Sequence, residues 1–167
     1  MTETLSPALP DEVDRAARAV LEEACDRELT LATAESCTGG LLASLLTDVE
    51  GCAHAFERGF VTYTDEAKTE LLGVPASLID EAGAVSEAVA RAMAEGALSR
   101  SHADVALAVT GFAGRGARGE EAGLVHFACA REGRKTAHRV AHFGDIGRGP
   151  VRIACLRVGL QMIDEAL

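Results

Sequence analysis

Hydrophobic residues recur along this chain with two alternating spacings. In residues 11–27 the apolar positions lie three or four residues apart, which predicts an amphipathic helix. The apolar run that begins at Leu29 and breaks at Glu35 predicts a strand, and the nearly continuous apolar run at 104–110 predicts a strand of the buried type. A tight turn follows the first of these strands and leads into a helix over residues 41–46, which is expected to stop near Gly51.

The rest of the chain continues the alternation. The further elements expected are a strand at 56–63, helices from Thr64 to Gly73 and over 86–99, a hairpin of strands at 123–131 and 135–143, and a helix at 151–166. Gly59, inside the strand at 56–63, suggests a bulge. Alternation of strands and helices predicts an α/β fold with helices on both faces of the sheet, and the hairpin requires at least one antiparallel strand.

Composition and charge narrow the class of protein. The chain has 167 residues, of which 48% are hydrophobic, so we expect a single domain over 1–167 with one core. Tryptophan is absent and only 4% of residues are aromatic, which points to a core of Ala, Val and Leu. The net charge of −10 repels phosphate groups and anionic lipids, so we expect no nucleic acid and no membrane as partner.

The cysteines and histidines show no ligand or disulfide pattern. The cysteines are Cys25, Cys37, Cys52, Cys129 and Cys155. Their odd number, with no CxxC pair, predicts reduced thiols. The 5 histidines show no HExxH spacing, so we expect no metal site. Neither a signal peptide nor an apolar run long enough to span a bilayer is present, which suggests a cytoplasmic protein.

The turn after the first strand, in the segment LTLATAESCTGGLL, carries the first candidate chemistry. It places Ser36, Cys37 and Thr38 at a helix N-terminus, where backbone N–H groups and the helix dipole favour negative charge. Gly39 and Gly40 allow a ligand or the next turn to approach the backbone closely. Two alternatives remain open: the turn is only a helix cap, or Cys37 is the nucleophile, because a helix N-terminus lowers the pKa of a thiol.

Three strand ends carry unusual residues and are expected to share a site. They are Ser36, Tyr63 and the pair Thr110 and Gly111, and in open α/β sheets ligands gather at the carboxyl ends of strands. Lys68 lies near a helix N-terminus, which disfavours its charged form, so its neutral amine could accept a proton from a serine hydroxyl. The alternatives are a solvated lysine and a tyrosine that merely fills the strand end.

Arginines flank two glycine-rich loops. They are Arg115, Arg118, Arg148 and Arg152. Guanidinium groups in such loops can clamp a phosphate group through two parallel hydrogen bonds, although each arginine alone could equally be solvated. We expect two of the four to contact an anionic ligand.

With these residues assembled, the chain resembles the C-terminal domain family of the competence/damage-inducible CinA proteins. The resemblance rests on the blocks TAESCTGGLLASLLTDVEG, FERGFVTYTDEAKTELLGV, GAVSEAVARAMAEGAL and ADVALAVTGFAG, which occur in the family's order. It implies a three-layer α/β/α sandwich with a mixed, mostly parallel sheet. It also implies an enzyme that hydrolyses the carboxamide of nicotinamide mononucleotide to nicotinate mononucleotide and ammonia, without a metal or other cofactor.

The resemblance also implies roles for individual residues. Ser36 would be the nucleophile, assisted by Lys68 and Tyr63, while Glu35 would either orient Lys68 or structure the turn. The residues expected to bind substrate are Cys37, Thr38, Gly39, Gly40, Thr110, Gly111, Arg148 and Arg152. The family suggests a homo-oligomer, a dimer or larger, and the amino-terminal partner domain of longer CinA proteins is expected to be missing here.

Two loops depart from the family pattern. The segment AGRGARGEEAGL has Arg115 in place of a proline, and GDIGRGPVR has an Ile-Gly insertion before Arg148. Both loops would surround the ribose and phosphate of the substrate. The alternatives are therefore an amidohydrolase for a related amide, or a nucleotide-binding or regulatory module without efficient turnover.

Overall fold

The computed structural model of the chain describes residues 9–115 and 119–167. In chain order its elements are α1 (Asp11–Asp26), β1 (Leu31–Glu35), α2 (Leu41–Leu46), η2 (Ala53–Ala55), β2 (Phe56–Val61), α3 (Asp65–Leu72), α4 (Ala76–Ala82), α5 (Glu87–Ser99), β3 (Val105–Gly111), β4 (Leu124–Arg131), β5 (Ala137–His142) and α6 (Arg148–Ala166). No helix within the described ranges is long and apolar enough to cross a lipid bilayer.

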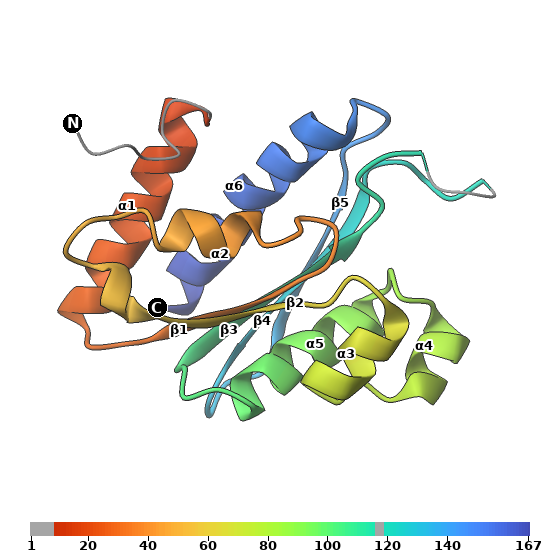
Figure 1. The fold of residues 1–167 in the computed structure, drawn as a ribbon, viewed down its shortest axis with the longest axis horizontal. Helices are drawn as coiled ribbons and strands as arrows, with labels where there is room; N and C mark the ends of the chain where they lie inside the picture. The colour runs from red at the N-terminus through yellow and green to blue at the C-terminus, as the bar shows by residue number, and fades with distance from the viewer. Residues whose placement is uncertain (1–8, 116–118) are drawn as a thin grey trace.

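The described strands form one sheet in the order β2-β1-β3-β4-β5 (Figure 1). β1 pairs in parallel with both β2 and β3, whereas β4 is antiparallel to both of its neighbours. Since β5 reverses direction again, β4 alone among these strands runs against the others. The predicted hairpin and the predicted mixed, mostly parallel sheet are both confirmed.

Helices cover both faces of this sheet, as the sequence predicted. α1, α2 and α6 lie on one face, and α3, α4 and α5 lie on the other (Figure 1). The first face carries larger strand side chains such as Leu31, Leu107 and Phe127. On the α5 face the buried strand residues are Ala32, Ala34, Ala106, Ala108, Ala128 and Ala130. These small side chains allow α5 to pack close to the sheet, and the expected core of Ala, Val and Leu is confirmed.

Three local expectations were wrong or incomplete. The register irregularity of β2 lies opposite Leu31 and Ala32, so the extra residue is Glu57, and Gly59 pairs regularly with Thr33. α4 was not expected, because Ile79 is its one buried residue and leaves almost no periodic signal. α6 begins at Arg148 and includes Pro150, which the first turn of a helix tolerates because its N–H groups have no partner within the helix.

Candidate active site

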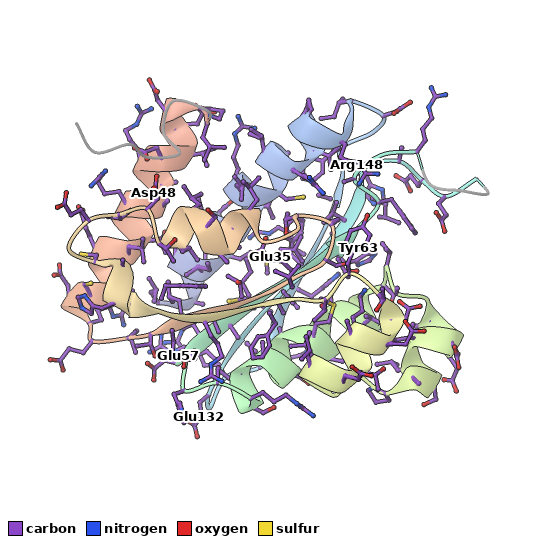
Figure 2. All side chains as sticks on the ribbon, viewed as in Figure 1. Glu35, Asp48, Glu57, Tyr63, Glu132 and Arg148 are labelled. Atoms are coloured by element: carbon purple, nitrogen blue, oxygen red, sulfur yellow. The ribbon has the colours of Figure 1, made fainter. Side chains whose placement is uncertain are left out.

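A cavity of about 340 Å³ opens where β1, β2 and β3 end. Of the residues expected to form a site, it brings together Ser36, Cys37, Tyr63, Lys68, Gly111 and Arg148. Figure 2 shows Glu35, Tyr63 and Arg148 near one end of the sheet. A larger hollow of about 600 Å³, lined in part by Asp104 and Arg131, contains none of the expected residues.

The register of the sheet explains why these chain segments converge. Glu35, the last residue of β1, pairs with Val61 of β2 on one side and with Val109 of β3 on the other. Beyond it, the N–H group of Ser36 donates to the carbonyl oxygen of Val109 (3.0 Å), and the N–H group of Thr62 donates to that of Glu35 (2.8 Å). β1 and β2 therefore end at the same level, and β3 extends two residues further, to Gly111.

Glu35 holds the turn that carries Ser36. Its side chain is fully buried, Oε1 accepts a hydrogen bond from the N–H group of Ala43 (2.7 Å), and Oε2 accepts one from that of Leu42 (3.0 Å). Gly40, the N-cap residue of α2, has φ 94° and no side chain that could accept these bonds. Glu35 therefore structures the turn. Its carboxyl oxygens accept the hydrogen bonds of N–H groups at the start of α2, which have no partner within the helix.

Three polar groups of the turn, two backbone N–H groups and one hydroxyl, are left without a partner in the described part of the chain. The N–H group of Gly39 donates to the Ser36 carbonyl (3.1 Å), and that of Leu41 donates to the Thr38 carbonyl (3.2 Å). Among the described residues, the N–H groups of Thr38 and Gly40 have no carbonyl or carboxylate partner. The hydroxyl of Thr38 is also buried without a hydrogen-bond partner in the described part of the chain.

Lys68 is buried, with 1% of its surface exposed, so the alternative of a solvated lysine is wrong. Its Nζ donates to the carbonyl oxygens of Thr62 (3.1 Å), Tyr63 (3.5 Å) and Thr64 (3.5 Å) and lies 3.9 Å from Oδ1 of Asp65. Burial lowers the pKa of Lys68, and the nearby charges of Asp65 and Cys37 act in the opposite direction. A lysine in this position can be neutral at a lower pH than an exposed one.

Ser36 and Tyr63 differ in their exposure. Ser36 is 8% exposed and lines the cavity, and in the described part of the chain no hydrogen bond joins it to Lys68. Tyr63 is 61% exposed, which places its ring at the rim of the cavity. The two lie where a bound molecule could contact both.

Cys37 lines the same cavity but is only 3% exposed. Interaction with the Cys155 thiol of α6, more than any other cause, lowers the pKa of Cys37. Arg152 lowers it further. The same interaction between the two thiols, together with burial, raises the pKa of Cys155.

Two of the candidate arginines line the cavity, and a third supports the turn from outside it. Arg148 lines the cavity, and its guanidinium packs 3.6 Å from where a Cβ on Gly114 would lie. Arg115 also lines the cavity, is largely exposed, and pairs with Asp145 (2.6 Å). Arg152 does not line it: its Nε donates to the carbonyl oxygen of Cys37 (2.9 Å) and so supports the turn from behind. Arg118 lies outside the described residues.

The other expected binding residues surround the cavity without lining it. Thr110 is buried, and its hydroxyl donates to the carbonyl oxygen of Ala84 (2.8 Å), which fixes the loop before α5 as one wall. Gly39 and Gly40 adopt positive φ angles of 61° and 94°. A Cβ on Gly39 would lie 3.6 Å from the Arg152 guanidinium, so this glycine allows the turn itself to approach α6.

Some lining residues escaped sequence reasoning. Ala84, Val85, Phe112 and Ala113 form apolar wall, and such residues carry no chemical signal in a sequence. Asp65 could have been found, since it precedes Lys68 by three residues and therefore lies on the same face of α3. Among the described residues, no group of three or more His, Cys, Asp or Glu side chains is placed to hold a metal ion.

The cavity thus combines a hydroxyl, a buried amine, a phenol and guanidinium groups. A hydroxyl beside an amine of lowered pKa can attack a carbonyl carbon, and arginines at the rim can hold an anionic group of the same molecule. The arrangement is suited to acyl transfer from a small anionic substrate.

Comparisons with known proteins agree with this architecture. Residues 13–167 match the family described as the CinA C-terminal domain. A CinA-like protein of Syntrophus aciditrophicus is 49% identical over 144 residues, which are 85% of this chain and 34% of that protein. A CinA-like protein of Akkermansia muciniphila is 54% identical over 121 residues, 71% of this chain and 29% of that protein. The chain therefore spans about a third of the length of these relatives.

Solved structures extend the similarity to nearly the whole chain. The competence/damage inducible protein CihA from Agrobacterium tumefaciens has a TM-score of 0.91 and 40% identity, covering 99% of this chain and 98% of that one. A competence-damaged protein (CinA) superfamily protein from Escherichia coli has a TM-score of 0.86 and 38% identity, covering 93% of this chain and 90% of that one. The fold, the ordered sequence blocks and these matches lead to one conclusion: the chain belongs to the CinA C-terminal domain family.

Proposed function

We propose that this protein hydrolyses the carboxamide of nicotinamide mononucleotide to nicotinate mononucleotide and ammonia. The observation that carries the proposal is the presence of Ser36 and the buried amine of Lys68 in one cavity, with Arg148 at its rim. The family resemblance suggests the substrate class, and the geometry supports the roles of nucleophile for Ser36, base for Lys68 and phosphate-binding cation for Arg148.

In the first step, Lys68 acts as the base. Its lowered pKa increases the fraction of neutral amine, which takes the proton from the Ser36 hydroxyl as the oxygen attacks the amide carbon. The Ser36 hydroxyl is not yet hydrogen-bonded to Lys68; catalytic pairs often reach hydrogen-bond distance only when substrate is bound. The backbone N–H groups of Thr38 and Gly40 are available to the oxyanion that forms.

In the second step, ammonia leaves and water enters. The departing nitrogen takes the proton that Lys68 received from Ser36, either directly or through the hydroxyl of Tyr63, whose exposed ring at the rim is accessible to the leaving group. Water then attacks the ester formed on Ser36, with Lys68 accepting its proton, and the carboxylate product is released. Each proton that Lys68 accepts is returned in the following step.

The decisive experiment measures ammonia release from nicotinamide mononucleotide by the purified protein without added metal. Ser36→Ala should reduce kcat by at least about a thousandfold, because the nucleophile is lost. Ser44→Ala, on the exposed side of α2, is the matched control and should retain wild-type activity. Circular dichroism would establish that both variants are folded.

Three outcomes would contradict the proposal in different ways. Activity that survives Ser36→Ala but is lost in Cys37→Ala and on thiol alkylation would make Cys37 the nucleophile. Release of ammonia from another amide, but not from nicotinamide mononucleotide, would change the substrate. Saturable binding of the nucleotide by a folded protein without turnover would favour the binding module.

A further inference from the structure

One acidic side chain lines the candidate cavity. Asp65 is the first residue of α3, and 58% of its side chain is exposed. Among the described residues that line the cavity, it alone carries a carboxylate, and the proposed hydrolysis gives it no part. A negative charge at this place repels an anionic ligand unless the ligand also carries a positive group. A molecule that fits the cavity is therefore expected to bring a positive charge to Asp65.

Within the described part of the chain, the cation paired with Asp65 is Lys68, whose Nζ lies 3.9 Å from Oδ1. Nζ also donates to three backbone carbonyl oxygens, so its position does not depend on Asp65. Burial lowers the pKa of Lys68, and the proposed reaction uses its neutral amine as the base. When this amine is neutral, Asp65 has no positive partner in the cavity wall.

Tyr63 adds an aromatic ring beside the same carboxylate. It lies two residues before Asp65, lines the same cavity and is 61% exposed. The carbonyl oxygen of Tyr63 lies 3.5 Å from Nζ of Lys68, so both residues surround this one amine. An aromatic ring attracts a flat organic cation through its quadrupole, and a carboxylate attracts it through its charge.

The basic side chains of the cavity come from other elements. Arg148 is the first residue of α6 and packs beside Gly114, and Arg115 follows Gly114 in the loop after β3. α3 and α6 cover opposite faces of the sheet (Figure 1), and Figure 2 shows Arg148 at the start of α6 and Tyr63 between β2 and α3. The acidic and aromatic groups therefore approach the cavity from one face of the sheet, and Arg148 approaches it from the other.

We propose that Asp65 and Tyr63 form a subsite for the cationic ring of an N-substituted pyridinium, so that the protein selects a substrate with a positive amide-bearing ring and a negative phosphate group. This assignment rests on the proposed function. One bond joins the amide carbon to the ring, so a carboxamide placed at Ser36 and Lys68 brings its ring into the region that Asp65 reaches. In nicotinamide mononucleotide the ring nitrogen carries the ribose and is therefore positively charged, whereas free nicotinamide is neutral.

A cation held by Asp65 would also act on Lys68. The charge of Asp65 raises the pKa of Lys68 and so opposes the effect of burial. A pyridinium ring beside both side chains offsets this charge and favours the neutral amine. A cationic substrate thus increases the fraction of Lys68 that can act as the base, and a neutral analogue does not.

The test compares two ligands that differ in the charge of the ring. Nicotinamide mononucleotide and its reduced 1,4-dihydro form share the amide, the ribose and the phosphate group, but the reduced ring is neutral. Each ligand is titrated into the Ser36→Ala protein, which lacks the proposed nucleophile, and the dissociation constant is measured by calorimetry. We expect the cationic form to bind at least about tenfold more tightly.

Asp65→Asn, made in the Ser36→Ala protein, removes the charge and keeps the shape, so the ratio of the two dissociation constants should fall below about threefold. Glu66→Gln is the matched control, because it makes the same change of charge in the first turn of α3 without lining the cavity, and it should keep the ratio. Tyr63→Phe should also keep the ratio, whereas Tyr63→Leu, which removes the ring, should lower it by about twofold or more. A purely structural role of Asp65 would weaken the binding of both ligands equally.

Equal affinity of the Ser36→Ala protein for the two ligands, or no binding of either, would overturn the subsite whether or not Asp65→Asn folds. A ratio that Asp65→Asn leaves unchanged would overturn it as well. Ammonia release by the wild type tests the proposed function separately. Release of ammonia together with equal affinities would overturn the subsite alone, whereas a ratio that depends on Asp65 in a protein that releases no ammonia would overturn the hydrolysis alone.

Discussion

Glu35 Oε1 accepts a hydrogen bond of 2.7 Å from the backbone N–H group of Ala43, eight residues further along the chain. The bond is made by a fully buried carboxylate, and it ties the end of β1 to the first turn of α2 across the turn that carries Ser36. The second oxygen binds Leu42, and among the described residues no hydrogen bond or ion pair joins Glu35 to Lys68. Glu35 is a positioning residue for Ser36.

Glu35→Gln should lower both stability and activity. Glutamine can accept only one of the two bonds and turns an NH₂ donor toward the other N–H group, so we expect a loss of about 1–3 kcal/mol in the free energy of unfolding. Denaturant titration measures this loss. Glu50→Gln, which alters an exposed side chain, should change stability by less than about 0.5 kcal/mol. Equal stability of the two variants would show that Glu35 does not hold the turn.

Lys68 should determine how activity depends on pH. Only its neutral amine accepts a proton, so kcat/KM should rise with pH through the pKa of Lys68, which burial places below its usual value of about 10.4. Lys68→Arg carries a permanent charge and should lose activity across the whole range. If Lys68→Arg kept the same fall in kcat/KM toward acidic pH as the wild type, Lys68 would be excluded as the base.

The same shift predicts a dependence of stability on pH. Between the lowered pKa of folded Lys68 and about 10.4, the unfolded chain binds more protons than the folded protein. The contribution of Lys68 to the free energy of unfolding should therefore rise with pH through this window. At acidic pH the contribution should be smaller. Lys68→Met should remove this contribution, which denaturant titrations at several pH values would measure.

Arg148 should act on substrate affinity more than on turnover. If it holds the phosphate group, Arg148→Gln should raise KM for nicotinamide mononucleotide at least tenfold, with a smaller change in kcat, since this contact is present in both ground and transition states. Arg157→Gln is the matched control on α6, because Arg157 pairs with Glu12. Nicotinamide riboside, which lacks the phosphate, should be hydrolysed equally by both variants.

Gly96, in α5, should not tolerate a larger side chain without a loss of stability. A Cβ at this position would lie 2.0 Å from the carbonyl oxygen of Leu72 at the end of α3, so Gly96→Ala should cost about 2 kcal/mol or more in unfolding free energy. Gly149→Ala is the control, since a Cβ there meets nothing within 4 Å, and it should be neutral or slightly stabilising. Similar thermal midpoints for the two variants would contradict this account of α5 packing.

Local sequence signals were enough to locate most of the sheet and several residues that line the cavity. Apolar runs marked β1 and β3, since central strands covered on both faces lack polar positions. Thr64 marked the start of α3, and its hydroxyl accepts the N–H group of Ala67 as expected of a cap. Ser36, Tyr63 and Lys68 could be named in advance because each combines a reactive group with a strand end or a helix start.

Other features depended on partners distant in sequence. The sequence alone left the role of Glu35 open, because a buried glutamate can bind either a lysine or a helix N-terminus. It also suggested that Arg152 binds substrate, whereas this side chain contacts the carbonyl oxygen of Cys37, 115 residues away.

For this protein, the sequence by itself determined the secondary structure pattern, the α/β class, the family and the chemical groups at the strand ends. These depend on hydrophobic spacing, caps and short motifs, which act over a few neighbouring residues. The tertiary structure decided which groups share the cavity, that Lys68 is buried, and that Glu35 and Arg152 support the turn. Burial and hydrogen-bond pairing depend on residues brought together by folding, and these set the pKa of Lys68 and the position of Ser36.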